Sequence, residues 1–213
     1  MNKDNAKLFV VSAPSGCGKG TILAEVLKRK EFFYSVSCTT RKPRDNEVDG
    51  VNYHYIDDDK FRQMISNNEF LEYAGYVSHY YGTPVKPVND CLEKGVDVVL
   101  EIETQGAFNV KKAMPEAVLL FILPPSVKEL KRRLNKRGTE PEDVINKRTA
   151  EAVGEIQKAY DYDYVIMNDA LEDAVEDFFK VVDSAKNGDS KADDFKTDNE
   201  KVKKMIDEVL KNA

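Results

Sequence analysis

Four short apolar runs limit the folds that are open to this chain of 213 residues. They are KLFVVS (7–12), DVVLEIE (97–103), AVLLFIL (117–123) and DYVIM (163–167), each rich in Val, Ile or Leu. Such nearly continuous runs are typical of strands that are covered on both faces, as in a parallel sheet. Segments with helical spacing, such as ILAEVLKRK and VKELKRRLNKR, lie between them. The alternation predicts an α/β sandwich around a parallel sheet.

The composition changes twice along the chain. Residues 34–83 are rich in Tyr, Thr and Ser, and we expect a small, mainly antiparallel α+β lobe around one helix at 58–67. This lobe is inserted into an α/β core formed by 1–33 and 84–186. After residue 186 the sequence turns polar, so we expect 187–213 to be a mobile or loosely docked charged extension. Within it, VKKMIDEVL has the spacing of a short amphipathic helix.

Composition excludes several classes of protein. With 41% hydrophobic and 33% charged residues, the chain reads as a globular domain. No apolar run approaches the roughly 20 residues that span a bilayer, and the first residues lack the apolar core of a signal peptide. Three cysteines are too few and too scattered for a disulfide framework or a zinc site, so we expect a cytoplasmic protein. The net charge of −6 argues against non-specific nucleic-acid binding, and any anionic ligand needs local cations.

The stretch SAPSGCGKGT (12–21) joins the first apolar run to a helical segment. Gly16 and Gly18 allow the chain to curl so that backbone N–H groups point at phosphate oxygens, and Lys19 extends toward the terminal phosphates. The stretch departs from the usual pattern G-x-x-x-x-G-K-[ST] at both ends, with Ala13 and Gly20. Ala13 is acceptable if its φ is negative. The alternative is an ordinary glycine-rich turn with an exposed lysine.

Gly20 stands where the usual pattern has a hydroxyl that binds Mg²⁺. Thr21 supplies a hydroxyl one residue later, about 100° further around the helix, so it does not replace that ligand. We therefore expect Mg²⁺ to be held mainly by nucleotide phosphates and water, and we assign no side chain to it. The ending GKGT resembles that of nucleoside monophosphate kinases more than that of motor or signalling NTPases. This resemblance implies a site that also admits a second phosphorylated substrate.

A second anion site is predicted within the inserted lobe. Arg41 and Arg44 flank a proline, and both guanidinium groups can converge on one anion, with Tyr53 adding a hydroxyl. Further on, Glu72, Tyr81 and Thr83 lie among aromatic residues and suit the edge of a base. The alternatives are solvated loop arginines and a carboxylate on a surface strand.

Across residues 7–185 the chain resembles the guanylate kinase family. The matching motifs occur in the family's order and are APSGCGKGT, SVSCTTRKPR, GVNYHY, NNEFLEYA, YYGTP, LEIETQGA, FILPPS, NKRGTE and INKR. The resemblance implies a P-loop three-layer sandwich with a parallel sheet, an inserted GMP-binding lobe and a lid at about 135–145. We therefore expect one domain of this family at 1–186, with the extension outside it.

The resemblance also implies the roles of individual residues. Lys19, Arg137 and Arg148 are the implied catalytic residues. The ATP-binding set is Ala13, Pro14, Ser15, Gly16, Cys17, Gly18, Lys19, Gly20, Thr21 and Asn168, the last of these at the adenine. For GMP, the set is Ser37, Glu72 and Thr83 at the guanine, Arg41, Arg44, Tyr53 and Tyr81 at the phosphate, and Glu103. Glu103 stands where the family often has Asp, so its contact with GMP or the metal is left open.

The implied activity is the transfer of a phosphoryl group from ATP to GMP by direct in-line displacement, giving ADP and GDP, with Mg²⁺. It belongs to purine nucleotide metabolism and the recycling of GMP. The implied partners are ATP and GMP, with no nucleic acid and no membrane, and either a monomer or a homo-oligomer. Two alternatives are a peptide-binding scaffold of the same fold and a P-loop kinase for another small acceptor.

Overall fold

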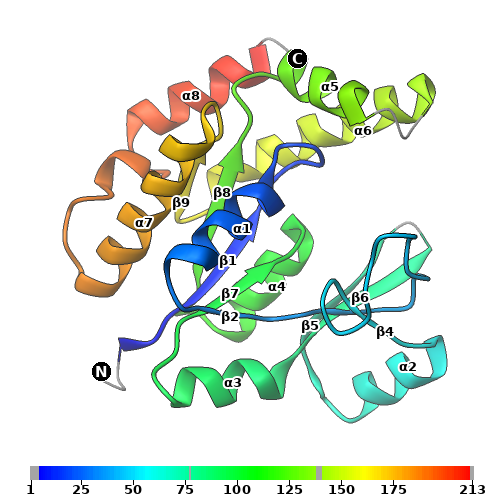
Figure 1. The fold of residues 1–213 in the computed structure, drawn as a ribbon. Helices are drawn as coiled ribbons and strands as arrows, with labels where there is room; N and C mark the ends of the chain where they lie inside the picture. Colours follow the sequence, from blue (N-terminus) through cyan, green and yellow to red (C-terminus); the bar gives the residue numbers. More distant parts are fainter. Residues whose placement is uncertain (1–4, 77, 138–140, 212–213) are drawn as a thin grey trace. The chain divides into compact units, whose positions relative to one another are not determined.

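The chain folds into helices and two β-sheets in a computed structural model that describes residues 5–76, 78–137 and 141–211 (Figure 1). The strands are β1 (Leu8–Ser12), β2 (Phe33–Tyr34), β3 (Cys38–Thr39), β4 (His54–Tyr55), β5 (Phe70–Tyr76), β6 (His79–Pro84), β7 (Val98–Glu101), β8 (Val118–Leu123) and β9 (Tyr164–Met167). The helices are α1 (Lys19–Arg29), α2 (Asp58–Ser66), α3 (Val85–Glu93), α4 (Thr104–Ala113), α5 (Val127–Arg137), α6 (Glu142–Gln157), α7 (Leu171–Asn187) and α8 (Glu200–Lys211), with short 3₁₀ turns η2 (Lys158–Asp161) and η3 (Asp193–Phe195). Within the described ranges no helix is long and apolar enough to cross a membrane.

Two compact units make up the chain. The first contains Met1–Val10 and Glu31–Ala117, and the second contains Val11–Lys30 and Val118–Ala213. The boundary passes through β1, which contributes residues to both. Each unit is described separately below.

The larger sheet has five strands in the order β2-β7-β1-β8-β9. β2 runs parallel to β7 with Phe33 opposite Val98, and β8 runs parallel to β9 with Leu120 opposite Tyr164. Every residue of β1 and β8 is buried, which explains why their sequences are continuous apolar runs rather than alternating ones. All four apolar runs identified in the sequence form strands of this sheet, and the predicted α/β class is confirmed.

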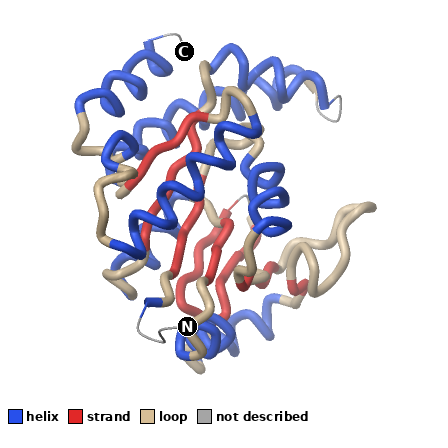
Figure 2. Tube along the Cα trace, turned by 60° about the vertical axis from the view of Figure 1, so that its left-hand side comes forward, coloured by secondary structure: helices blue, strands red, loops and turns tan. Residues whose placement is uncertain are grey.

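The smaller sheet lies in the first unit and has the order β4-β3-β6-β5. Figure 2 shows the strands in red and the helices in blue. β6 is antiparallel to β3 and β5, whereas β3 and β4 are parallel. Helix α2 begins after Asp57, whose carboxylate accepts a backbone N–H of the first turn at 2.7 Å. Its Phe61 stacks on Phe70 and Tyr80 at centroid distances of 4.5 and 5.4 Å. The helix predicted at 58–67 is present, and two of the three strand pairs are antiparallel.

In the second unit, α1 and α7 pack against each other. α1 contributes the buried side chains Ile22, Leu23 and Val26. On the solvent side, Arg29 forms ion pairs with Glu172 at 2.6 Å and Glu176 at 2.7 Å. Because both acids are largely exposed, these pairs add little stability, and the apolar contacts hold the helices together.

The segment after α7 is an ordered part of the second unit. α7 ends at Gly188, which adopts the left-handed conformation (φ 66°) of a helix C-cap. Lys196 then forms an isolated antiparallel bridge with Tyr164 of β9. The backbone N–H of Thr197 donates to the Asp163 carbonyl at 3.4 Å. The extension is therefore attached to the sheet edge before α8 begins.

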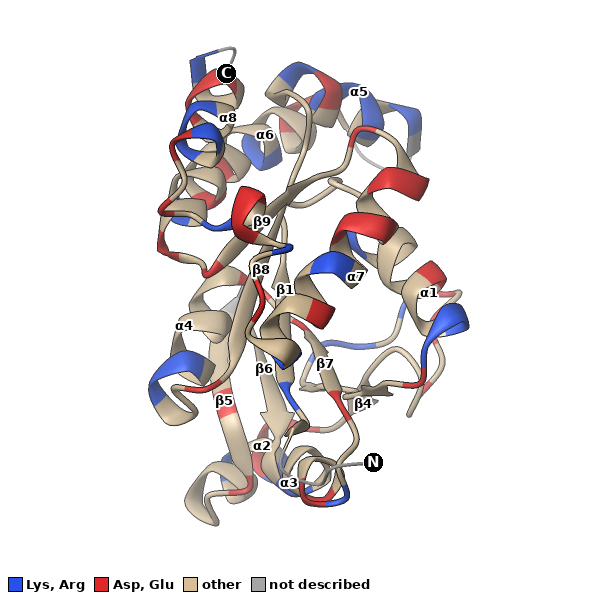
Figure 3. Cartoon of the chain, turned by 90° about the vertical axis from the view of Figure 1, so that its left-hand side faces the viewer, with Lys and Arg blue, Asp and Glu red and all other residues tan. Residues whose placement is uncertain are grey.

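α8 packs against α6, and Val202, Ile206 and Val209 on one side of it are buried. Its other side carries charged residues, as the alternating blue and red segments of Figure 3 show. The expectation of a mobile or loosely docked extension was wrong, whereas the amphipathic helix suggested by VKKMIDEVL is present. Average composition misled the prediction, because a stripe of three apolar residues is sufficient for docking although most of the segment is polar.

We expect the α8 contact to contribute to the stability of the whole protein. Replacing the fully buried Ile206 with Ala removes apolar contacts and leaves a cavity, so Ile206→Ala should lower the free energy of unfolding by about 2–4 kcal/mol. Lys204→Ala, on the exposed side of the same helix, should change it by less than about 0.5 kcal/mol. Urea denaturation followed by circular dichroism measures both. Equal stability of the two variants would contradict the docked position of α8.

Candidate active site

The turn between β1 and α1 depends on two glycines. Gly16 and Gly18 have φ angles of 91° and 96°, which other residues rarely adopt. Space is also limited, because a Cβ on Gly16 would lie 2.7 Å from Leu134 Cδ2 and one on Gly18 would lie 2.6 Å from Asn168 Nδ2. Ala13 is not among the described residues with a positive φ, so its side chain is tolerated as expected. The positive φ angles therefore favour glycine at both positions, and a larger residue would also require Leu134 or Asn168 to shift.

The positive end of α1 follows this turn directly. Gly18 is the N-cap residue, so no side chain caps the helix, and the first turn contains no acidic residue. Lys19 is the first residue of the helix and Gly20 the second. Backbone N–H groups at an uncapped helix start, together with a lysine, form a site that favours an anion such as phosphate.

The carbonyl oxygen of Cys17 is fixed from two directions within the second unit. Asn168 Nδ2 donates to it at 2.6 Å, and Arg133 Nη1 donates at 3.1 Å. Arg133 Nη2 also donates to the Asn168 carbonyl at 3.1 Å, and its Nε donates to Glu129 at 2.9 Å. These contacts connect α5 and the end of β9 to the loop. The loop conformation is therefore set by its neighbours as well as by its own glycines.

Cys17 itself has a structural role. Burial raises the pKa of its thiol to about 12, and the Sγ lies 3.4 Å from the Ile122 carbonyl, to which it donates. The thiol is therefore neutral and unreactive, and Cys17 contributes its backbone rather than its side chain to the loop.

The sequence reasoning missed Arg133. Arg133 lies in a charged helical segment, and nothing local in the sequence connects it to residues 17 and 168. Asn168 was expected to contact adenine, and the structure places its amide on the Cys17 carbonyl. That contact supports the loop; the role at adenine stays a prediction.

Of the two arginines expected at the transferred group, Arg148 lies on α6 with Nη1 3.5 Å from the Ser15 hydroxyl. It therefore reaches the glycine-rich loop from a helix 133 residues further along the chain. Arg137 is the last residue of α5, and its side chain lies outside the described part of the structure. Residues 138–140 of the expected lid at 135–145 also lie outside the described residues.

In the first unit, Glu72 and Thr83 lie opposite each other on β5 and β6. Thr83 Oγ1 donates to Glu72 Oε1 at 2.7 Å, and the glutamate is only 7% exposed. Burial raises the pKa of the Glu72 carboxyl to about 7; the Thr83 hydrogen bond lowers it and the charge of Glu103 raises it further. Burial between these strands removes water from the charged form of the carboxylate, which is unfavourable. A carboxylate in such a position is typical of a binding site.

Helix α4 approaches the same carboxylate. A Cβ on Gly106 would lie 2.9 Å from Glu72 Oε2, so only glycine allows the helix this close. Glu103 is the N-cap residue of α4 and makes no capping hydrogen bond with its side chain. Glu72 and Glu103 thus lie near each other at the start of one helix.

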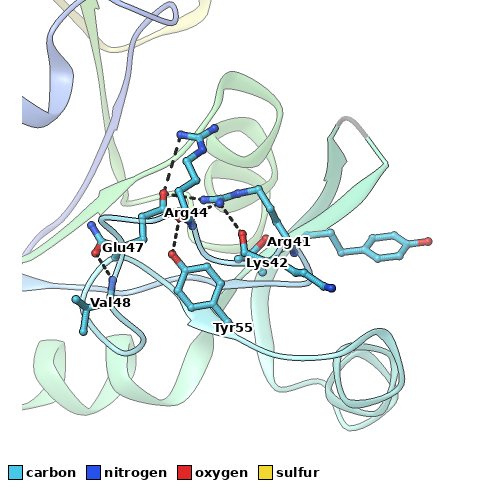
Figure 4. A network of polar contacts seen from close by, with 9 residues as sticks. Arg41, Lys42, Arg44, Glu47, Val48 and Tyr55 are labelled. Atoms are coloured by element: carbon cyan, nitrogen blue, oxygen red, sulfur yellow. Dashed lines mark hydrogen bonds and ion pairs between the residues drawn. The ribbon is translucent and has the colours of Figure 1, made fainter. Parts of the chain in front are cut away.

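The two predicted phosphate-binding arginines converge on one anion, the carboxylate of Glu47 (Figure 4). Arg41 binds it through Nη1 at 2.8 Å and Nη2 at 2.9 Å, and Arg44 Nη1 lies 4.0 Å from it. The rings of Tyr53 and Tyr55 pack near Arg41, with centroids 5.5 and 5.9 Å from its Cζ. Both arginines therefore lie near one carboxylate of the protein, and their role at a phosphate stays a prediction.

The remaining predicted residues of this lobe adjoin the arginines. Tyr53 and Tyr81 lie with ring centroids 5.8 Å apart. Ser37 precedes β3, and its carbonyl accepts the His54 N–H at 2.9 Å. The structure brings together Arg41, Tyr53 and Tyr81 as one cluster and Glu72, Thr83 and Glu103 as another.

Two acidic residues near these clusters were not identified from the sequence. Glu47 is one, and Glu101, which accepts a hydrogen bond from the Tyr34 hydroxyl at 2.9 Å, is the other. The proximity of Glu101 contributes to the raised pKa of Tyr53, after burial and Tyr81. The proline-arginine motif could have drawn attention to Glu47, three residues after Arg44, but its distance from Arg41 depends on the fold of the loop.

Among the described residues no group of three or more His, Cys, Asp and Glu side chains could hold a metal ion.

A family model described as Guanylate kinase matches residues 5–185. The chain belongs to the guanylate kinase family. A guanylate kinase of Thermus thermophilus is 52% identical over 182 residues, which are 85% of this chain and 82% of that protein. A guanylate kinase from Carboxydothermus hydrogenoformans is 53% identical over 180 residues, which are 84% of this chain and 88% of that protein. A crystal structure of guanylate kinase from Anaplasma phagocytophilum superposes with a TM-score of 0.73 at 32% identity. The match covers 86% of this chain and 87% of that chain.

Membership of the guanylate kinase family confirms the resemblance that the motifs indicated. The glycine-rich loop and the inserted lobe both lie inside the matched range, whereas η3 and α8 lie after it. The docked C-terminal helix is thus an addition to the part of the chain that the family model describes.

The buried Glu72 should make the stability of this family member depend on pH. Its folded pKa of about 7 exceeds the usual 4.5, so the unfolded chain releases the proton first as the pH rises. Its contribution therefore lowers the free energy of unfolding between about pH 4.5 and 7, by about 3 kcal/mol in total, and is constant above that range. Glu72→Gln should be more stable than the native protein at pH 8 and close to it at pH 5.

Denaturant titrations of both proteins at pH 5 and pH 8 test this expectation. The expectation is supported if the difference in the free energy of unfolding between Glu72→Gln and the native protein is smaller at pH 5 than at pH 8. A stability difference that is the same at both pH values would mean that Glu72 titrates normally in the folded protein.

Proposed function

We propose that this chain transfers the terminal phosphoryl group of ATP to GMP, giving ADP and GDP by direct in-line displacement. The proposal follows from membership of the guanylate kinase family together with the two groups of residues described above. The loop at 13–21 takes the ATP phosphates, and the lobe carrying β3 to β6 takes GMP. For transfer to occur, the two bound substrates must meet with water excluded, because water would otherwise accept the phosphoryl group.

The buried carboxylate of Glu72 is the observation that carries the choice of base. Guanine presents two donors on one edge, N1–H and the exocyclic amine, and a carboxylate can accept both. Adenine has an unprotonated N1 there, whose lone pair would face the negative charge. The Ser37 hydroxyl can donate to guanine O6, where adenine carries an amine, and the Thr83 hydroxyl can do so when it releases Glu72. We assign Glu103, near Glu72, to the same GMP site.

The phosphate of GMP is assigned to the cluster of Arg41, Arg44, Tyr53 and Tyr81. Two guanidinium groups and two phenol hydroxyls can neutralise and position a phosphate monoester. Because one oxygen of this monoester is already ionised near neutral pH, it can attack without a general base. The lobe therefore needs to position its substrate rather than activate it.

On the ATP side, charge neutralisation supplies most of the acceleration. The backbone N–H groups of the loop hold the phosphates, and Lys19 stabilises charge on the group being transferred. Arg137 and Arg148 are assigned to the same charge from α5 and α6. Asn168 is assigned to the adenine in addition to its support of the loop.

Mg²⁺ is proposed as the cofactor. The residues at the start of α1 fit an ion that arrives with ATP, since Gly20 leaves the coordination mainly to phosphate oxygens and water. When bound, the ion neutralises negative charge on the phosphates. The protein's own part is to hold those phosphates through the loop and Lys19.

We place this activity in purine nucleotide metabolism and the recycling of GMP, in the cytoplasm. Cys17, Cys38 and Cys91 are free thiols, as a reducing compartment would keep them.

A coupled assay of ADP release with GMP, AMP, CMP and UMP tests the reaction. GMP should be strongly preferred, because polar groups in the site are left unpaired by the wrong base, a penalty that can reach about 10⁴-fold. The proposal would be refuted if another acceptor were preferred to GMP, or if none of the four acceptors were phosphorylated.

Lys19→Ala should abolish transfer while leaving the fold intact. The lysine is half-buried at the first position of α1, and its charge is proposed to act on the phosphoryl group in the transition state. Removing such a group should lower kcat by at least about 10²-fold. Lys28→Ala, on the last turn of the same helix, provides a control with the same loss of charge. Near-normal turnover by Lys19→Ala would show that the phosphate-loop assignment is wrong.

Glu72→Gln should lose most of its activity on GMP. An amide offers one acceptor oxygen, and its NH₂ group opposes a guanine donor, so kcat/KM should fall roughly 10- to 150-fold. Glu93→Gln, an exposed glutamate at the end of α3, is the matched control. Steady-state assays of both variants with GMP and AMP make the comparison. Native rate and affinity for GMP in Glu72→Gln would mean that this carboxylate does not read the base.

A further inference from the structure

Glu47 is the most highly coordinated acidic side chain of the lobe, and the proposed reaction assigns it no role. Its Oε2 accepts from Arg41 Nη1 at 2.8 Å, from the Arg44 backbone N–H at 2.8 Å and from the Tyr55 hydroxyl at 2.9 Å. Its Oε1 accepts from Arg41 Nη2 at 2.9 Å. These contacts, chiefly the Arg41 hydrogen bonds, lower the pKa of the carboxyl to about 2. Glu47 is therefore ionised at neutral pH.

The bonds to Glu47 use one defined edge of Arg41. A guanidinium group has five N–H donors, and the carboxylate takes one from each terminal nitrogen. Nη1 also donates to the Lys42 carbonyl at 2.8 Å, which uses its second hydrogen. The donors outside these contacts are Nε–H and the second hydrogen of Nη2, which lie together on the other edge. Arg41 thus has a second two-donor edge that does not face Glu47. The Tyr81 hydroxyl also contacts this side chain, and an edge of this kind can bind a phosphate in a bidentate manner.

The surroundings of Arg41 hold it in this orientation. Tyr53 and Tyr55 pack near it, and the side chain is only 15% exposed. The pKa of Arg41 is raised, first by the Glu47 hydrogen bonds and also by a contact with the Tyr81 hydroxyl. Tyr81 belongs to the proposed phosphate cluster, so Arg41 is contacted on one side by Glu47 and elsewhere by a residue expected at the substrate phosphate.

Release of Glu47 by an incoming phosphate would break more than the arginine contact. The Glu47 backbone N–H donates to the Arg44 carbonyl at 3.0 Å, so the carboxylate and the backbone together close the turn from Arg44 to Glu47. The hydrogen bonds from the Arg44 N–H and the Tyr55 hydroxyl would also be lost. A carboxylate with this many partners is a fixed part of the loop rather than a temporary substitute for phosphate.

We propose that Glu47 is a positioning residue that holds Arg41 by its terminal edge and so presents the Nε and Nη2 edge to the phosphate of the nucleoside monophosphate. The inference rests on the proposed function of the lobe and adds a residue to it. With Arg41, Arg44 and Glu47 together carrying one net positive charge, the carboxylate reduces the charge of the site but fixes its geometry. An arginine without this partner must lose more side-chain entropy when it binds.

The kinetic test compares Glu47→Gln with the native enzyme and with the control Glu93→Gln. An amide cannot accept from all the donors around Glu47, so Arg41 loses its fixed orientation. We expect the KM for GMP to rise roughly 10- to 100-fold, with kcat and the KM for ATP within about twofold. Glu47→Asp retains the charge on a shorter side chain and should recover part of the loss. An unchanged or lower KM for GMP in Glu47→Gln overturns the proposal, and a lower value would show that Glu47 competes with the phosphate.

A second variant allows the proposal to be tested even if Glu47→Gln does not fold correctly. Tyr55→Phe removes one hydrogen bond to Glu47 and keeps the ring beside Arg41, so the KM for GMP should rise by about two- to fivefold with kcat unchanged. Hydrogen exchange of the ligand-free proteins should show faster exchange of residues 41–55 in Glu47→Gln, and not in Glu93→Gln. Unchanged exchange there also overturns the proposal. If the native protein transfers no phosphoryl group to GMP, the proposed function fails, and the exchange comparison still decides whether Glu47 orders the Arg41 loop.

Discussion

The close approach of side chains to the backbone of two glycines is the constraint on which the nucleotide-binding part of this protein depends. Gly16 and Gly18 combine positive φ angles with close contacts from Leu134 and Asn168, whose side chains would have to shift to admit a Cβ. Arg133 and Asn168 then fix the carbonyl of Cys17 between them. Because the loop is held from α5 and from the end of β9, it is shaped before any ligand arrives, which reduces the entropy lost on binding phosphate.

The lobe that we propose to bind GMP uses charge in two different ways. Glu72 is buried against Thr83 and α4, where its charge is poorly solvated, and a ligand that donates to it replaces the missing water. Glu47 is surrounded by donors and keeps a low pKa. We propose that Glu72 accepts hydrogen bonds from the ligand, whereas Glu47 accepts its hydrogen bonds from the protein. The contrast explains how two glutamates of one lobe can have opposite pKa shifts and different proposed roles.

The C-terminal extension shows how few apolar residues can attach a polar segment. Three buried aliphatic side chains hold α8 against α6, and Lys196 and Thr197 connect the preceding segment to the edge of β9. Since α6 also carries Arg148, the extension stabilises the helix that brings this arginine to Ser15. The addition lies outside the range of the family model, yet it packs on a helix that carries a proposed catalytic residue.

The amino-acid sequence determined the class of the fold and the composition of the sites, because both depend on local patterns. Continuous Val, Ile and Leu runs indicated buried parallel strands, and SAPSGCGKGT indicated a phosphate loop, since glycine spacing and a lysine express that geometry directly. The lobe helix at 58–67 was likewise predicted from its own spacing.

Only the tertiary structure decided which distant residues complete these sites. Arg133 lies 116 residues from Cys17, and α8 meets α6 although β9 and α7 separate them in the chain, so no local pattern announces either contact. The orientation of Arg41 depends on Glu47, whose carboxylate reaches it through a turn of the lobe, and on packing by two tyrosines. The pKa of Glu72 depends on its burial, which is a property of the assembled sheet and of α4. Residue types and spacing are local, whereas burial, charge pairing and side-chain orientation result from contacts that exist only after the chain has folded.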